Sequence, residues 1–213
     1  MHKESTILLS TAYLPPVEYM AIFLKYENII IEKEETYPKQ TYRNRCKIMT
    51  ANGILNLPIP VNKTNGNNTK IKEITISNTD LWYINHWRAI NSAYSGSPFF
   101  LYYKDDLIRF YDKKYNNLLE FNTELTKTLL SLIGIKYNIE FSNSFVKPNT
   151  TSNDLRFSIS PKKENESYAF KKYIQVFSNK FKFIPNLSII DLLFNLGPET
   201  KDYLTDLANQ PET

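Results

Sequence analysis

The stretch from Tyr37 to Lys47 holds the densest group of side chains that could bind an anion. Four cations and two phenols lie within these eleven residues. Arg43 and Arg45 offer rigid bidentate donors to a phosphate or carboxylate, Lys39 adds a mobile point charge, and the tyrosines can stack on a sugar or base. This pattern predicts a site for an anionic small molecule, such as a nucleotide-activated sugar.

The same stretch also allows an interpretation without a ligand. Its cations could lie on a solvated strand pair and form surface ion pairs with Glu32, Glu34 and Glu35. Cys46, among these cations, could act as a nucleophile if its thiolate were favoured, or it could simply be a small buried side chain. The residue types alone leave these alternatives open.

His86 is the candidate general base, because imidazole titrates close to neutral pH. It lies in the aromatic segment 82–88 (Trp-Tyr-Ile-Asn-His-Trp-Arg), where it could equally be a hydrogen-bonded core residue. His2 is the other histidine and Cys46 the one cysteine, so neither a disulfide nor a histidine-rich metal centre is expected. We expect no intrinsic cofactor, although magnesium could arrive with a substrate.

Several common functions are disfavoured by missing motifs. The five glycines allow neither a Walker loop nor a dinucleotide-binding fingerprint, and there is no G-x-S-x-G elbow. A net charge of +4 without any RNA-binding motif predicts no nucleic-acid partner. No apolar run is long enough to span a membrane, and the apolar stretch near the N-terminus is too short for export, so we expect a cytoplasmic protein.

The elements that must position these residues are of mixed type. An apolar run over 5–12, a helical pattern from Pro16 to Tyr26 and a second run over 28–31 predict a parallel β-α-β opening. Strand-like patterns over 55–61 and 72–76 predict an antiparallel extension. We therefore expect one α/β domain over residues 1–213, with helices packed on the faces of its sheet.

The second half reads as helices interrupted by short strands. The apolar spacing predicts three helices: one after the cap candidates at 78–80, one over 107–118, and one from Asn122 to a terminating Gly134. Alternation over 135–141 and 157–159 predicts strands before a charged linker at 162–167. Ser188 and Asp191 have the spacing of a capping pair for a helix that stops at Gly197.

Several motifs, taken in order, resemble the WbqC-like protein family. They are Tyr13-Leu-Pro-Pro-Val-Glu-Tyr19, Lys39-Gln-Thr-Tyr-Arg-Asn-Arg45, Leu57-Pro-Ile-Pro-Val61, His86-Trp87 with Ala93-Tyr94, and the closing segment Phe183–Pro198. Thr11-Ala12 departs from the pattern, since many relatives have Gln-Pro there, and any role of that glutamine is absent or supplied elsewhere.

The resemblance implies a place in O-antigen or other surface-polysaccharide biosynthesis, where glycyl or other aminoacyl transfer to a sugar has been suggested for some members. It also implies that one set of matching residues lines a pocket: Tyr13, Tyr19, Lys39, Asn44, Arg45, His86, Tyr94, Gln175 and Asp191.

Together these observations lead to the hypothesis of a group transferase. Lys39, Arg43 and Arg45 would hold an activated donor, and His86 would remove a proton from the acceptor. The alternative is a non-catalytic protein that binds or scaffolds a sugar-nucleotide or polysaccharide precursor, which would need the cations but not His86.

Overall fold

The computed structural model describes residues 4–148, 150, 153–162 and 168–210. Its chain begins with β1 (Glu4–Leu9), α1 (Val17–Lys25) and β2 (Tyr26–Ile31), and β7 (Ile139–Phe141) joins later. The three strands form a parallel sheet in the order β1-β2-β7, with Leu9 opposite Ile31. The predicted β-α-β opening and the mixed α/β class are therefore confirmed.

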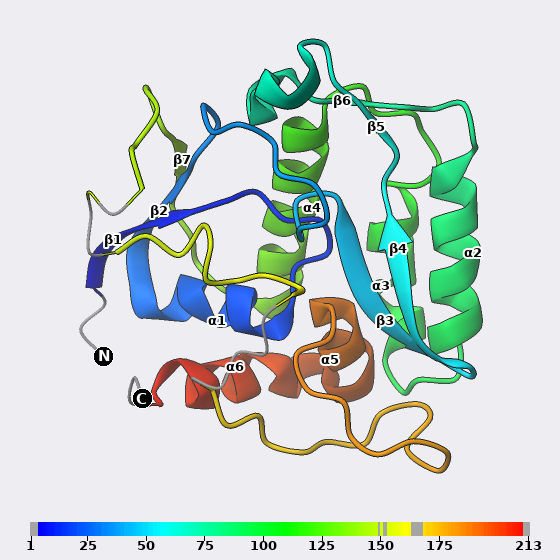
Figure 1. The fold of residues 1–213 in the computed structure, drawn as a ribbon. Helices are drawn as coiled ribbons and strands as arrows, with labels where there is room; N and C mark the ends of the chain where they lie inside the picture. The colour runs from blue at the N-terminus through cyan, green and yellow to red at the C-terminus, as the bar shows by residue number, and fades with distance from the viewer. Residues whose placement is uncertain (1–3, 149, 151–152, 163–167, 211–213) are drawn as a thin grey trace.

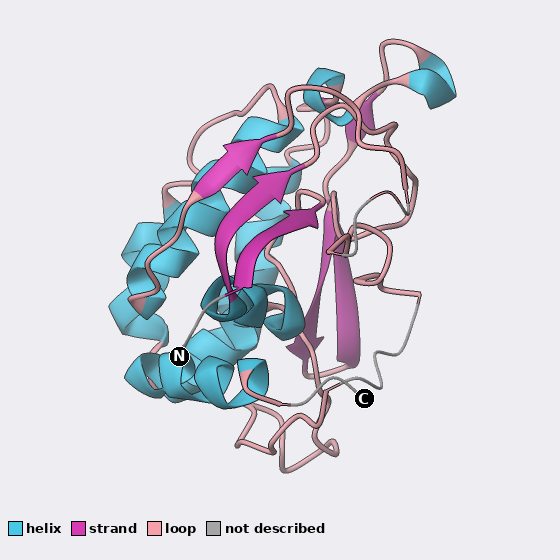
Figure 2. Ribbon diagram, turned by 90° about the vertical axis from the view of Figure 1, so that its left-hand side faces the viewer, coloured by secondary structure: helices cyan, strands magenta, loops and turns pink. Residues whose placement is uncertain are grey.

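The antiparallel strands form two ladders of their own instead of extending this sheet. β3 (Arg45–Thr50) pairs with β4 (Gly53–Pro58), and the short β5 (Val61–Asn62) pairs with β6 (Thr75–Ile76). Figure 2 shows the β3–β4 ladder standing apart from the three parallel strands. Of the strand expected over 72–76, only Thr75–Ile76 (β6) forms, because a 3-10 turn (Ile71–Glu73) occupies the first half.

The helices differ from the predicted ones at their ends. They are α2 (Trp82–Tyr94), α3 (Phe100–Ile108), α4 (Leu118–Ile133), α5 (Ile189–Leu196) and α6 (Thr200–Ala208), with 3-10 turns at Gly66–Asn68 and Gly197–Glu199. The helix expected over 107–118 ends at Ile108, and α4 begins before Asn122. The side chain of Asn117 caps α4 by accepting from the Glu120 amide, 3.0 Å away. Gly134 ends it with φ of +78°, as predicted.

The turn between β1 and α1 is fixed from both sides. Leu14 has a positive φ of 38° immediately before two prolines, a conformation that a non-glycine residue adopts only when its surroundings impose it. The Tyr13 amide donates to the Tyr42 carbonyl (2.8 Å), and the Pro15 carbonyl accepts from the Ile189 amide (2.8 Å). The rigid turn therefore holds the backbone of Tyr13 and Pro15 between Tyr42 and the start of α5, while the Tyr13 ring packs against His86 and Phe121.

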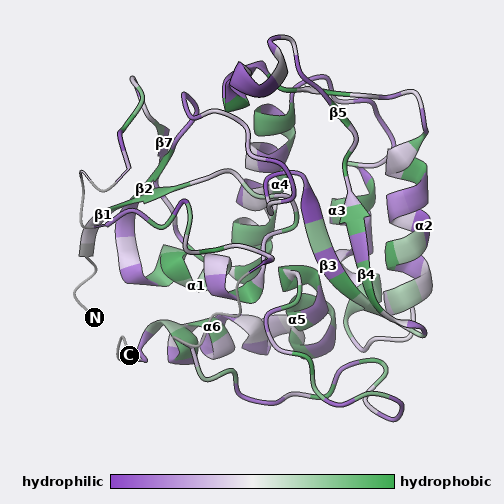
Figure 3. Ribbon diagram, viewed as in Figure 1, coloured by the Kyte–Doolittle hydropathy of each residue, from purple (hydrophilic) through white to green (hydrophobic). Residues whose placement is uncertain are grey.

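Buried hydrophobic side chains from Ile7 to Ala208 form the core. α1, α5 and α6 pack together beside the parallel sheet, whereas α2 stands at the opposite side of the molecule (Figure 1). The hydropathy of α2 alternates along its length, as expected of a helix with one solvated face (Figure 3).

The strand predicted over 157–159 is wrong, since this segment forms turns. Within the described ranges, no helix has the length and apolarity needed to cross a membrane.

Candidate functional site

Tyr13, His86 and Tyr111 form a buried chain of hydrogen bonds. The Tyr13 hydroxyl lies 2.9 Å from His86 Nδ1 and 2.9 Å from the Tyr111 hydroxyl. The rings of Tyr13 and His86 stack with their centroids 5.6 Å apart, and Trp82 meets the imidazole edge-on at 5.1 Å. The sequence motifs around Tyr13 and His86 thus meet in space, although 73 residues separate the two side chains.

His86 is held in its neutral form. Its side chain is 5% exposed, and burial lowers its pKa to about 4 because the charged imidazolium would lose its hydration. A hydrogen bond to the backbone of Pro58 opposes part of this shift. A carbonyl can only accept a hydrogen bond. The ring N–H therefore faces Pro58, and Nδ1 accepts from the Tyr13 hydroxyl.

Of the buried side-chain atoms that have no hydrogen-bond partner among the described residues, three belong to residues 44–45 and to the α4 residue bonded to the adjoining Arg43: Asn44 Oδ1, Arg45 Nε and Asn122 Oδ1. Both amide orientations are fixed, because Asn44 Nδ2 donates to the Ile59 carbonyl and Asn122 Nδ2 donates to the Arg43 carbonyl, each at 2.8 Å. Leaving such an atom unpaired costs about 1–3 kcal/mol. We call Asn44, Arg45 and Asn122 the polar cluster.

The polar cluster and His86 are connected through β4. Arg45 lies opposite Pro58 in the β3–β4 ladder, and Pro58 is the residue whose backbone contacts His86. The next residue, Ile59, donates its amide to the Asn44 carbonyl at 2.7 Å. One end of one hairpin therefore carries two of the unpaired atoms and supports the imidazole.

The cations of the basic stretch have different surroundings. Arg43 is buried and forms a bidentate pair with Glu35 (2.8 Å for both bonds), so its charge is neutralised inside the protein and not in a surface pair. Lys39 is exposed. Arg45 is half-buried. Burial raises the pKa of the Tyr37 phenol to about 12, and the positive charge of Arg45 nearby opposes part of this rise. Lys63 lies 5.1 Å from the Tyr37 ring centroid, which adds a second cation.

Tyr94, Gln175 and Asp191 form a second network. Asp191 is fully buried and accepts hydrogen bonds from Tyr94 (2.9 Å), Tyr173 (2.6 Å) and Gln175 (3.0 Å). Burial raises the pKa of Asp191, and these three donors oppose the rise. Tyr94 follows His86 by eight residues on α2, a separation of about 12 Å along the helix axis. The candidate residues thus occupy two places and not one pocket.

The WbqC-like protein family profile matches residues 11–172. The chain belongs to the WbqC-like family. The uncharacterised protein Rv1507c of Mycobacterium tuberculosis is similar to this WbqC-like chain, with 27% identity over a 229-residue alignment that covers 94% of the chain and 97% of the relative. No solved structure matches. The polar cluster, Tyr13 and His86 lie inside the matched range, whereas Gln175 and Asp191 lie beyond it.

Asp191 does not cap α5 in this WbqC-like chain, so the predicted capping pair is wrong. The Ser188 side chain makes no cap hydrogen bond, and the Asp191 carboxylate turns inward to Tyr94 and Tyr173. The Gln175 side chain accepts a hydrogen bond from the Ile184 amide and donates one to the Ile184 carbonyl. It also donates to the Asp191 carboxylate. The carboxylate serves to anchor the chain around Gln175.

Tyr19 and Cys46 are core side chains. The Tyr19 hydroxyl donates to the Ser10 carbonyl at 2.9 Å. Cys46 is fully buried, and burial raises its thiol pKa, which favours the interpretation of a small core side chain over that of a nucleophile. No group of three potential ligands for a metal occurs in the part of the chain that the structure describes.

The sequence patterns did not indicate Asn122, Tyr111 or Tyr173. Asn122 carried a readable signal, because it lies four residues after Leu118 and three before Leu125, on the buried stripe of α4. A polar residue on such a stripe needs a partner and is worth noting. The roles of Tyr111 and Tyr173 depend on contacts across 98 and 18 residues, and no local pattern reports these.

Proposed function

We propose that this WbqC-like chain is a group transferase whose polar cluster binds an anionic, activated donor. The observation that carries the proposal is the set of three unpaired buried atoms, Asn44 Oδ1, Asn122 Oδ1 and Arg45 Nε. Two acceptors and a cationic donor in the polar cluster suit a ligand that has hydroxyl or amino groups next to a phosphate or carboxylate. A sugar phosphate or a nucleotide-activated sugar has this combination, and an aminoacyl donor shares it.

Arg45 is the best anion ligand of the basic stretch. Arg43 is already paired with Glu35, whereas Arg45 has no partner for its Nε and is partly open to solvent. Lys63 lies over the Tyr37 ring, and Arg45 is close enough to the Tyr37 phenol to lower its pKa, so Lys63 and Tyr37 would add charge and a stacking surface. The exposed Lys39 would add only long-range attraction.

In this proposal His86 works through Tyr13. The lone pair of the imidazole is at Nδ1, which faces the Tyr13 hydroxyl. A proton from the acceptor would therefore pass to the Tyr111 oxygen, as Tyr111 gives its own proton to Tyr13 and Tyr13 gives its own to His86. With a pKa of about 4 the imidazole is a weak base. A bound anion nearby would raise that pKa and so couple donor binding to proton transfer.

The alternative function is a non-catalytic binder of the same precursor. It is favoured by the fact that both ring nitrogens of His86 are already engaged, one by Tyr13 and the other by Pro58. In that case the hydrogen-bonded chain only shapes the polar cluster.

The experiment compares three variants in donor binding and in turnover. Sugar nucleotides and aminoacyl donors are screened by thermal shift, since a ligand that binds the folded state raises its melting temperature. Arg45→Ala should abolish the shift. His86→Gln and Tyr13→Phe should keep the shift and lose transfer to an amino sugar acceptor. Retained transfer in His86→Gln would eliminate the catalytic role, and an unchanged shift in Arg45→Ala would eliminate the site itself.

A further inference from the structure

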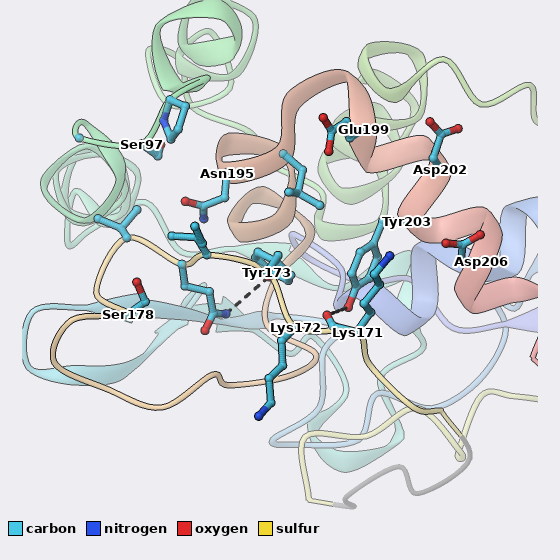
Figure 4. A pocket seen from close by; sticks show the side chains of 16 residues that line it. Ser97, Lys171, Lys172, Tyr173, Ser178, Asn195, Glu199, Asp202, Tyr203 and Asp206 are labelled. Carbon is cyan, nitrogen blue, oxygen red and sulfur yellow. Dashed lines mark hydrogen bonds between the residues drawn. The ribbon is translucent and has the colours of Figure 1, made fainter.

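A cavity of about 950 Å³ lies between α5, α6 and the segment 168–187, which we call the strap. The wall opposite the strap is the turn at 96–98 (Figure 4). None of the residues of the polar cluster lines this cavity. It therefore offers a second site, distinct from the one proposed for the donor.

One wall of the strap cavity is acidic. Glu199, Asp202 and Asp206 all line it, and their spacing of three and four residues places them on one face of the last helical turns. All three are exposed, and no ion pair joins any of them to another residue of the described ranges. Their negative charges are therefore open to a ligand.

Asn195 offers the cavity a hydrogen-bond acceptor in addition to the carboxylates. Its side chain is 9% exposed and lies between the turn carrying Ser97 and the strap (Figure 4). Its Nδ2 donates to the Asp191 carbonyl at 2.7 Å, which fixes the amide orientation. Its Oδ1 has no partner in the described part of the chain and lines the cavity as an acceptor.

Two tyrosines give the cavity an aromatic corner. The rings of Tyr173 and Tyr203 meet edge to face, with centroids 5.6 Å apart. Both hydroxyls are used, since Tyr173 donates to Asp191 and Tyr203 donates to the Lys171 carbonyl at 2.7 Å. What these residues present to the cavity is ring surface, which attracts cations and packs against the C–H face of a sugar.

Two lysines also line the cavity, and their positive charges offset part of the negative potential of the acidic wall. Lys171 lies beside Tyr203, and Lys172 extends away from Asn195 (Figure 4). The part of the wall between Asn195, Glu199 and Asp202 is consequently the place where acceptors outnumber cations.

We propose that the strap cavity binds a small molecule that carries a protonated primary amine. The ammonium group donates to Asn195 Oδ1 and faces Glu199 and Asp202, while the body of the ligand packs on the tyrosine corner. Bound water could satisfy Asn195, but it would not distinguish a charged ligand from a neutral one, and that difference provides the test.

The test uses glucosamine as the probe, with N-acetylglucosamine and glucose as neutral controls of the same ring shape. Binding is measured by isothermal titration at two salt concentrations. Glucosamine should bind, the neutral sugars should bind much more weakly, and added salt should weaken glucosamine alone. Each of Glu199→Gln and Asp202→Asn should weaken glucosamine binding by about two- to fivefold, as expected for exposed charges.

The control variants establish whether glucosamine binds in the strap cavity. Asp112→Asn removes an exposed carboxylate elsewhere and should change nothing, and Arg45→Ala, which affects the polar cluster, should leave glucosamine binding intact. Asn195→Ala should weaken glucosamine binding as well. Equal binding of glucosamine and N-acetylglucosamine, or binding that is insensitive to Glu199→Gln and Asp202→Asn together, would overturn the proposal, as would the absence of any glucosamine binding.

Discussion

The buried neutral state of His86 makes a quantitative prediction about stability and pH. Burial lowers the pKa of His86 in the folded protein to about 4, whereas an unfolded histidine has a pKa of about 6.5. The unfolded state therefore binds the proton more readily. The stabilisation is fully present above about pH 6.5 and is lost as the pH falls toward 4.

The size of the loss follows from the two pKa values. A difference of about 2.5 units corresponds to roughly 3 kcal/mol over the whole range, and about 2 kcal/mol of this is lost between pH 7.5 and pH 5. His86→Gln removes the titrating group and keeps one donor for Pro58 and one acceptor for Tyr13. This variant should lose about 2 kcal/mol less than the wild type over the same interval.

Urea denaturation at a series of pH values measures the effect as a difference between the two proteins. The comparison is needed because burial raises the pKa of Asp191 and of Glu35, and these groups stabilise the folded state as the pH falls, which partly hides the histidine. Asp112→Asn is the control for an ordinary surface charge. Parallel pH profiles for the wild type and His86→Gln would refute the assignment of a buried, neutral imidazole.

Three other predictions follow from the buried polar contacts. Asp191→Asn should destabilise the protein by about 1–3 kcal/mol, because the acceptor for Tyr173 and Gln175 becomes in part a donor; chemical denaturation measures this, and an unchanged midpoint would contradict it. Arg43→Met should cost about 3–5 kcal/mol by stranding Glu35, and a second change, Glu35→Met, should restore most of the loss in the same assay. Cys46 should react with a thiol reagent only after unfolding; rapid labelling of the native protein would refute its burial.

Local patterns in the sequence were sufficient for the parts of the fold that depend on local physics. The prolines after Tyr13, the periodicity of α2 and the left-handed Gly134 could be predicted because each acts over a few residues. The separate antiparallel ladders could not, since strand partners are chosen by contacts between distant segments. The prediction of one helix over 107–118 is wrong, because α3 ends at Ile108 and Asn117 caps the start of α4.

The candidate site was predictable to a similar extent. Residue types and the family resemblance selected Asn44, Arg45 and His86, but they could not reveal that Glu35 neutralises Arg43. They also grouped Asp191 with His86, although the carboxylate belongs to a separate network. Both errors have the same cause, because charge partners in the core are set by tertiary packing.

The proposed function depends on Arg45 binding an anion, and ligand titration tests this most directly. The sugar nucleotide or aminoacyl donor that gives the largest thermal shift is titrated by calorimetry into the wild type, Arg45→Ala and Lys136→Ala, the last being an exposed cation outside the polar cluster. We expect binding that is lost in Arg45→Ala and kept in Lys136→Ala. Equal affinity in all three proteins would contradict the proposed function.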